Sequence, residues 1–104
     1  MVKRPKNRDQ EKTYKMEIVS AKCWNCESPM KVAIIVHSGE FFGPDRFSKK
    51  ETEFARSRGV ILENHFSKTT NSTYLANTCG QCGEFIGQFF IHEYLYQGEM
   101  YDLN

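Results

Sequence analysis

Apolar and polar residues alternate in two stretches of the first third of the chain, at residues 14–19 and 30–36. A period of two places every second side chain on the same face, which is typical of β-strands. Residues 32–36 of the second stretch are all apolar, which indicates a strand that is covered on both faces. The pattern therefore predicts two neighbouring strands, with Cys23 and Cys26 at the tip of the hairpin that joins them.

A short helix is predicted in the middle of the chain. Ser48 and Glu51 have the spacing of a capping box, in which each side chain bonds to the other residue's backbone N–H group. Gly59 is a natural C-terminal stop for a helix that begins near residue 49. Phe54 is the main apolar residue in between. We therefore expect a helix over residues 49–58 that lies on the surface of a sheet.

The rest of the chain is expected to form strands and loops. Apolar residues predict three more strands, over residues 60–66, 74–76 and 84–94. Glycine, proline and small polar residues predict loops over residues 38–46 and 67–73. The second Cys-x-x-Cys pair then also lies between two strands.

Charge divides the chain into three parts, although the net charge is only +1. The first part, residues 1–12, is polar and basic and is expected to be a flexible arm. Residues 13–94 are expected to form one domain, and residues 95–104 an acidic, aromatic tail. No stretch approaches the roughly 20 apolar residues of a membrane span, and residues 1–15 have no apolar run typical of a secretory signal. We therefore expect a cytoplasmic protein that has no membrane partner.

All four cysteines of the chain belong to two Cys-x-x-Cys pairs. Four thiolates form the complete ligand set of a tetrahedral zinc site, and such a site is structural because no coordination position is left for water or substrate. We therefore predict that one structural zinc ion is bound by Cys23, Cys26, Cys79 and Cys82.

Disulfide bonds and redox chemistry are the alternatives for these cysteines. Two disulfides require an oxidising compartment, and a thioredoxin-like pair requires a βαβ context that the pattern does not show. The second pair is followed by Gly83, which tolerates the positive φ angle of a metal-binding turn. The first pair is followed by Glu27 instead, so we expect it to turn by a different route.

Two Cys-x-x-Cys turns at hairpin tips, at residues 23–26 and 79–82, resemble the zinc-ribbon class of four-cysteine domains. The resemblance implies the metal and the local fold, but no particular function. Short ribbons have about 15–20 residues between the two pairs, whereas this chain has 52. We therefore expect an α+β fold in which zinc-ribbon-like antiparallel hairpins carry the two pairs and the insertion carries the helix and a further strand.

The first functional hypothesis is a non-enzymatic, accessory or regulatory nucleic-acid-binding protein. Cationic side chains can grip phosphates, and an aromatic ring can stack on a base. The candidate residues come from the arm, the first Cys-x-x-Cys pair and the start of the helix: Lys3, Arg4, Lys6, Arg8, Trp24, Lys49 and Lys50.

Two other hypotheses stay open. The chain has no lysine or arginine after Cys82 but many aromatic residues, which is typical of a protein-interaction module, an inhibitor of a larger complex or a homodimer. Alternatively, Asn64-His65 and Asn77 echo the first two elements of a His–Asn–His nuclease, although its third element is missing after the second cysteine pair. The salt dependence of binding separates the first two hypotheses.

Overall fold

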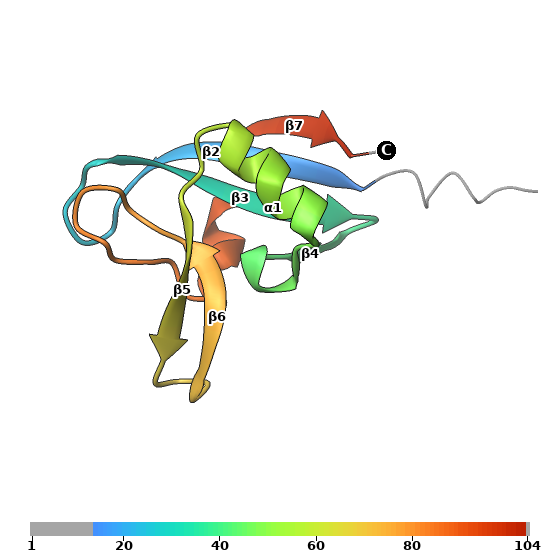
Figure 1. Ribbon diagram of the computed structural model, residues 1–104. Coiled ribbons are helices and arrows are strands. Elements are labelled where there is room, and N and C mark those ends of the chain that lie inside the picture. The colour runs from blue at the N-terminus through green and yellow to red at the C-terminus, as the bar shows by residue number, and fades with distance from the viewer. Residues whose placement is uncertain (1–13, 104) are drawn as a thin grey trace, which may run out of the picture.

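The two longest strands, β2 (Lys15–Lys22) and β3 (Pro29–His37), form an antiparallel hairpin in the middle of the fold. The computed structural model describes residues 14–103, and Figure 1 shows how its elements are arranged. The register pairs Lys15 with Val36 at one end and Lys22 with Pro29 at the other. The first cysteine pair therefore lies in the turn at the tip of this hairpin, as predicted.

Two short strands complete a four-stranded sheet in the order β4-β3-β2-β7. Strand β4 (Glu40–Phe42) pairs with β3, and strand β7 (Glu99–Asp102) pairs with β2. The predicted loop over residues 38–46 is thus wrong in part, since it contains β4 and the 3-10 helix η2 (Pro44–Arg46). The prediction of a tail beyond residue 94 is wrong as well, because β7 is an edge strand of the main sheet. The predicted arm, residues 1–12, lies outside the described residues.

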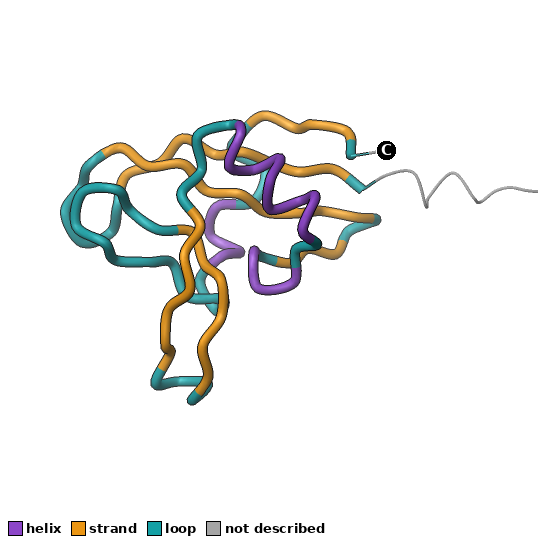
Figure 2. Tube along the Cα trace, viewed as in Figure 1, coloured by secondary structure: helices purple, strands orange, loops and turns teal. Residues whose placement is uncertain are grey.

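Helix α1 (Lys49–Ser57) confirms the prediction from the sequence. The Ser48 backbone N–H donates to Glu51 Oε1 at 2.7 Å, and the Glu51 N–H donates to Ser48 Oγ at 3.1 Å, which is the expected capping box. Gly59 follows the helix with a φ of +92°. The helix lies against the central hairpin (Figure 2), where Ala55 is fully buried and Phe54 is partly buried.

Strands β5 (Leu62–Ser67) and β6 (Ser72–Asn77) form a separate antiparallel hairpin that extends away from the main sheet (Figure 1). The predicted strand over residues 60–66 begins two residues late, because the Val60 N–H bonds to the Ala55 carbonyl at 3.2 Å and closes the end of α1. The loop that was predicted over residues 67–73 contains the turn of this hairpin. The strand that was predicted over residues 74–76, before the second cysteine pair, is part of β6.

The predicted strand over residues 84–94 is wrong. After a single bridge between Thr78 and Phe85, the chain turns and enters the 3-10 helix η3 (Ile91–Tyr94). Ile86 and Ile91 are buried, whereas Phe89 and Phe90 between them are both more than half exposed. The apolar residues of this segment therefore do not alternate between a buried and an exposed face, as a strand would require.

The two faces of the central hairpin are covered by different parts of the chain. One face packs against α1 and the start of β5 in a cluster that includes Ile18, Ala33 and Ala55. The other face packs against the second cysteine pair and η3 in a cluster that includes Cys79, Ile86 and Ile91. This confirms the prediction that β3 is covered on both faces. For the described residues, it also confirms the prediction of an α+β fold with antiparallel strands and one α-helix. No helix within residues 14–103 is long and apolar enough to cross a membrane.

Candidate metal centre

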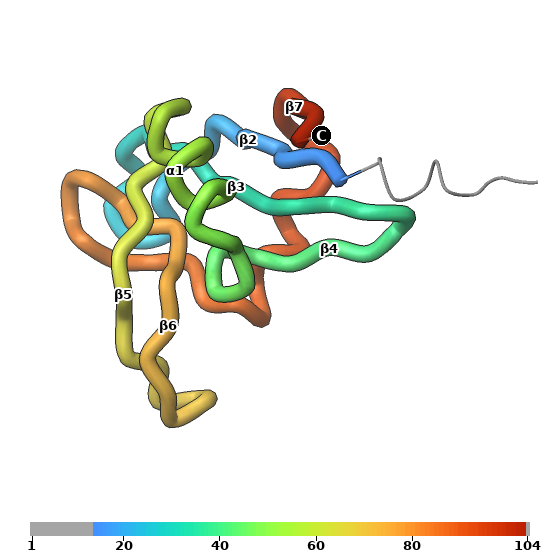
Figure 3. The backbone as a smooth tube through the Cα atoms, turned by 45° about the vertical axis from the view of Figure 1, so that its right-hand side comes forward, coloured from blue at the N-terminus to red at the C-terminus, as the bar shows by residue number. Residues whose placement is uncertain are grey.

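The two cysteine pairs meet at one end of the molecule, where Figures 1 and 3 show the two turns next to each other. All four sulfur atoms lie within 4.8 Å of one another. The Cys23 and Cys82 sulfurs are 3.6 Å apart, and so are those of Cys26 and Cys79. A tetrahedral zinc site with Zn–S bonds of about 2.3 Å places its sulfurs about 3.8 Å apart. The four cysteines therefore form a group that can hold one metal ion.

The first turn is held by backbone hydrogen bonds around its own cysteines. The Cys23 N–H donates to the Ser28 carbonyl at 2.9 Å, and the Glu27 N–H donates to the Cys23 carbonyl at 2.9 Å. The Asn25 N–H points at the Cys23 sulfur, 3.3 Å away. An N–H group aimed at sulfur stabilises the thiolate, which is the form that binds metal.

The second turn repeats this pattern position by position. The Cys79 N–H donates to the Glu84 carbonyl at 2.8 Å, the Gly83 N–H donates to the Cys79 carbonyl at 3.0 Å, and the Gln81 N–H lies 3.4 Å from the Cys79 sulfur. Gly83 has a φ of +80°, and Glu27 holds the equivalent position of the first turn with a φ of +65°. The expectation that the first turn takes a different route is therefore wrong. A glutamate adopts there the conformation for which glycine is better suited.

The four cysteines differ in burial. Cys23 and Cys79 are buried against the apolar core, whereas Cys26 and Cys82 are exposed. Hydrogen bonds from the side chain and the backbone of Ser28 lower the pKa of the Cys26 thiol to about 6. The exposed thiol of the first pair is thus prepared to act as a thiolate ligand near neutral pH.

Within residues 14–103, the four cysteines are the one cluster of histidine, cysteine and acidic side chains that can surround a metal ion. None of the histidine or carboxylate side chains in the described part of the chain joins them. Four thiolates saturate a tetrahedral ion and leave no open position for water. The group can therefore complete the coordination of one metal ion by itself.

Beyond the sulfurs, a tryptophan side chain links the two turns. Trp24 lies between the first two cysteines, and its Nε1–H donates to the carbonyl of Phe85 at 3.1 Å, just after the second turn. The Trp24 ring itself is 60% exposed. The hydrogen bond therefore orients the ring, which is still accessible. The sequence indicated Trp24 as a candidate residue but did not show what orients its side chain.

Asn77, one of the nuclease candidates, has a side chain that connects the two sheets. The Ala33 N–H donates to Asn77 Oδ1 at 2.8 Å, and Asn77 Nδ2 donates to the Ala33 carbonyl at 3.2 Å. The residue is fully buried. His65, the other nuclease candidate, contacts Thr78 Oγ1 at 2.9 Å through Nε2 and stacks on Phe85 at 4.3 Å between ring centroids. Both residues thus have structural contacts, and Asn77 is not accessible to a substrate.

Among the described residues, the basic candidates do not line the same surface as Trp24. Lys49 and Lys50 are exposed at the start of α1, and neither lines the cleft on which the Trp24 ring lies. The described chain begins at the opposite end of β2 from Trp24, and the eight residues of that strand span about 26 Å. Lys3, Arg4, Lys6 and Arg8 lie outside the described residues.

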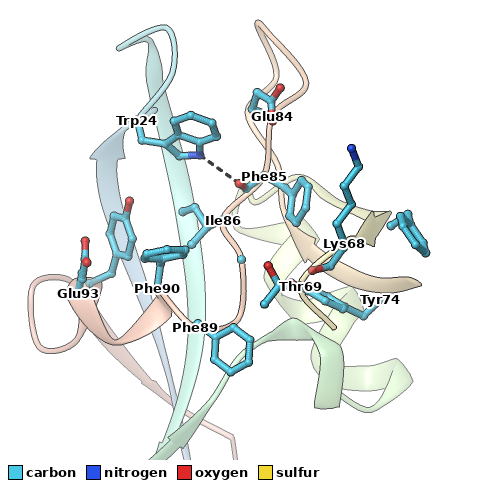
Figure 4. A pocket seen from close by; sticks show the side chains of 14 residues that line it. Trp24, Lys68, Thr69, Tyr74, Glu84, Phe85, Ile86, Phe89, Phe90 and Glu93 are labelled. Atoms are coloured by element: carbon cyan, nitrogen blue, oxygen red, sulfur yellow. Dashed lines mark hydrogen bonds between the residues drawn. The ribbon is translucent and has the colours of Figure 1, made fainter. Parts of the chain in front are cut away.

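Sequence reasoning missed a cleft of about 610 Å³ beside the first turn, shown in Figure 4. We call it the aromatic cleft and define it by its apolar and charged lining residues, which are Trp24, Phe66, Lys68, Tyr74, Glu84, Phe85, Ile86, Phe89, Phe90, Glu93 and Tyr94. The run of aromatic residues after Cys82 pointed to this region. The contribution of the β5–β6 hairpin was not visible in the sequence, because it depends on how that hairpin packs.

Comparison of the chain with protein-family models, with curated proteins and with solved structures finds no match.

Proposed function

We propose that this chain is a zinc-stabilised, non-enzymatic binding domain in which Cys23, Cys26, Cys79 and Cys82 hold one structural Zn²⁺ ion. The observation that carries the proposal is the convergence of four sulfur atoms within 4.8 Å from two turns of the same geometry. Soft thiolates in a tetrahedral arrangement suit zinc better than magnesium, calcium or manganese. Iron is the main competitor for such a ligand set.

The role of the ion is to close the fold. It would join two turns that are separated by 52 residues. Structural zinc binding contributes on the order of 10 kcal/mol to the folding of small domains. Such a contribution matters here because the core of a chain of this length is small.

Native mass spectrometry combined with thiol alkylation tests the metal. We expect the mass of the purified chain to exceed its sequence mass by one zinc ion, and we expect all four thiols to react only after a chelator is added under denaturing conditions. Thiols that react only after reduction would instead show disulfides, and a mass increment due to iron would replace zinc in the proposal.

For the partner, we propose a protein. The charge pattern supports this choice: residues 1–13 carry five basic and two acidic side chains, a balance of +3, so that the net charge of +1 leaves −2 for the rest. Four of the six aromatic residues after Cys82, namely Phe85, Phe89, Phe90 and Tyr94, line the aromatic cleft, whereas Tyr96 and Tyr101 do not. A mildly acidic domain with exposed aromatic side chains is better suited to a protein surface than to a phosphate backbone.

Nucleic-acid binding stays a second candidate because of the cations in residues 1–12. Deletion of these residues tests it by the salt dependence of binding to a mixed-sequence DNA duplex. If nucleic acid is the partner, the deletion lowers the affinity and flattens the salt slope. If a protein is the partner, binding to the duplex is weak both with and without these residues.

A further inference from the structure

Three segments that are distant in the sequence build the aromatic cleft. Trp24 comes from the first cysteine turn, Tyr74 and Lys68 come from the β5–β6 hairpin, and Phe89 comes from the chain after the second turn. Figure 4 shows the stretch from Glu84 to Ile86 running between these groups. The cleft is therefore a product of the tertiary fold and of the junction between the two cysteine turns.

The aromatic rings of the cleft are exposed to an unusual degree. Trp24, Phe66, Phe89 and Phe90 are 60%, 56%, 58% and 59% exposed. Within residues 14–103, none of these four rings stacks on another aromatic ring. Contiguous exposed apolar surface of this kind marks a binding site more often than a bare solvent face.

Several contacts hold the inner wall of the cleft in place. Phe85 is stacked on His65 and meets the Tyr74 ring edge-on at 6.3 Å between centroids, and its carbonyl accepts the Trp24 hydrogen bond. The Tyr74 hydroxyl accepts a hydrogen bond from the Gln88 N–H at 3.2 Å. A wall that is already ordered reduces the entropy that a ligand loses on binding.

Charge in the cleft favours a cationic occupant. Two carboxylates, those of Glu84 and Glu93, and one ammonium group, that of Lys68, line it. The carboxylates attract lysine and arginine side chains and repel phosphates. The faces of exposed aromatic rings attract the same cations. Nucleic acid is therefore disfavoured at this site, and a basic peptide is favoured.

We propose that the aromatic cleft binds a short peptide segment of a partner protein, in which large apolar side chains stand next to lysine or arginine. The inference rests on the proposed function, because the metal fixes Trp24 and Phe85 on either side of the junction. The volume of about 610 Å³ lies within the range of about 300–1,000 Å³ that is typical of ligand sites. The apolar side chains enter the cleft, and the basic ones face Glu84 and Glu93.

A phage-displayed library of random dodecapeptides, selected on immobilised zinc-loaded full-length chain, tests the proposal. We expect the enriched peptides to combine aromatic or leucine residues with lysine or arginine. Synthetic copies of them should change the fluorescence of Trp24, which is the sole tryptophan of the chain and therefore reports directly on the cleft.

Matched variants locate the binding site. The double variant Phe89→Ala/Phe90→Ala should weaken peptide binding about tenfold or more, because exposed aromatic anchors dominate such interfaces. Phe41→Ala is the control, since Phe41 is an exposed aromatic residue of β4 outside the cleft, and it should leave binding unchanged. Glu84→Gln/Glu93→Gln should weaken binding and reduce its salt dependence.

Four results would overturn the proposal: no enrichment on folded, zinc-loaded chain; enrichment of acidic peptides; unchanged binding in the double alanine variant; or displacement of the peptide by oligothymidine. Self-association that Phe89→Ala/Phe90→Ala abolishes would assign the cleft to a second copy instead.

Native mass spectrometry on the same samples separates a failure of the peptide site from a failure of the proposed zinc centre. A zinc-loaded chain that selects no peptide rejects the peptide site alone, and a metal-free chain that selects basic apolar peptides rejects the zinc centre alone.

Discussion

The two faces of the central β2–β3 hairpin are stabilised by different means. On one face, α1 and the start of β5 form an ordinary apolar layer with Met16, Ile35 and Leu62 in its core. On the other face, apolar burial is supplemented by specific interactions, which are those of the cysteine cluster and of the Glu17 carboxylate. This second face is also the one that leads to the aromatic cleft. The domain thus uses directional interactions on the face that carries the aromatic cleft and mainly non-directional packing on the opposite face.

The Glu17 carboxylate is the less expected of these two groups. Glu17 is fully buried in β2, and its oxygens accept hydrogen bonds from three consecutive backbone N–H groups, those of Tyr96 at 2.8 Å, Gln97 at 2.5 Å and Gly98 at 2.7 Å. Such a run of N–H groups forms a natural anion-binding loop. A Cβ atom on Gly98 would lie 2.1 Å from the Ile18 carbonyl oxygen, so only glycine fits there. This contact holds β7 against the sheet.

The largest expected effect comes from breaking the metal centre. Cys79→Ser should abolish cooperative folding, because the loss of one buried thiolate removes most of a metal contribution on the order of 10 kcal/mol. Circular dichroism during thermal unfolding measures the effect. A melting curve close to that of the unsubstituted chain would show that the second face does not depend on the metal.

Removal of the Glu17 carboxylate should have the next largest effect. Glu17→Ala should lower the free energy of unfolding by about 3–5 kcal/mol, because it removes the charged acceptor of three backbone N–H groups. Urea unfolding measures the change. Glu63→Ala removes an exposed carboxylate from β5 and serves as the control, which should stay within about 0.5 kcal/mol of the parent. Equal effects of the two substitutions would refute the anchoring role.

The link between the two sheets should contribute less. Asn77→Ala removes both hydrogen bonds to Ala33 and should cost about 2 kcal/mol. Asn64→Ala, at an exposed position of β5, is the matched control and should be nearly neutral. Hydrogen exchange of the Ala33 amide gives a local readout: it should accelerate in Asn77→Ala, and unchanged protection there would contradict the assignment.

The apolar face should respond weakly to changes in its polar groups. Ser48→Ala removes the capping box of α1 and should cost about 1 kcal/mol, whereas Ser48→Asp should retain most of the stability. Both changes are measured by urea unfolding. If Ser48→Ala were as damaging as Glu17→Ala, the contrast between the two faces would be lost.

The smallest expected effect distinguishes the two cysteine turns. Glu27→Gly should raise the stability by about 1 kcal/mol, because glycine adopts a positive φ without the strain of a Cβ atom. Gly83→Ala, at the equivalent position of the second turn, should lower it by a similar amount. Opposite signs in thermal unfolding support the equivalence of the turns, and equal signs contradict it.

The sequence revealed those parts of the fold that depend on local patterns. Alternation indicated β2 and β3, the Ser48 and Glu51 pair indicated the start of α1, and the spacing of the cysteines indicated the cluster. These features need only neighbouring residues or a fixed chemical geometry. Their counterparts in the structure lie where they were expected, with boundaries shifted by one to three residues.

What the sequence did not reveal depends on contacts between distant residues. Glu17 occupies a polar position of an alternating strand, and nothing near it shows that residues 96–98 cover it. Strand β7 has four residues and no apolar alternation, so it becomes visible only through its pairing with β2. The aromatic cleft likewise requires the packing of the β5–β6 hairpin beside the second cysteine turn.

The measurement that tests the central claim most directly is X-ray absorption at the zinc edge on the purified chain. The account predicts one zinc ion per chain surrounded by four sulfur atoms at about 2.3 Å. A chain without zinc, or an ion surrounded by nitrogen and oxygen atoms in place of the four sulfurs, would contradict it.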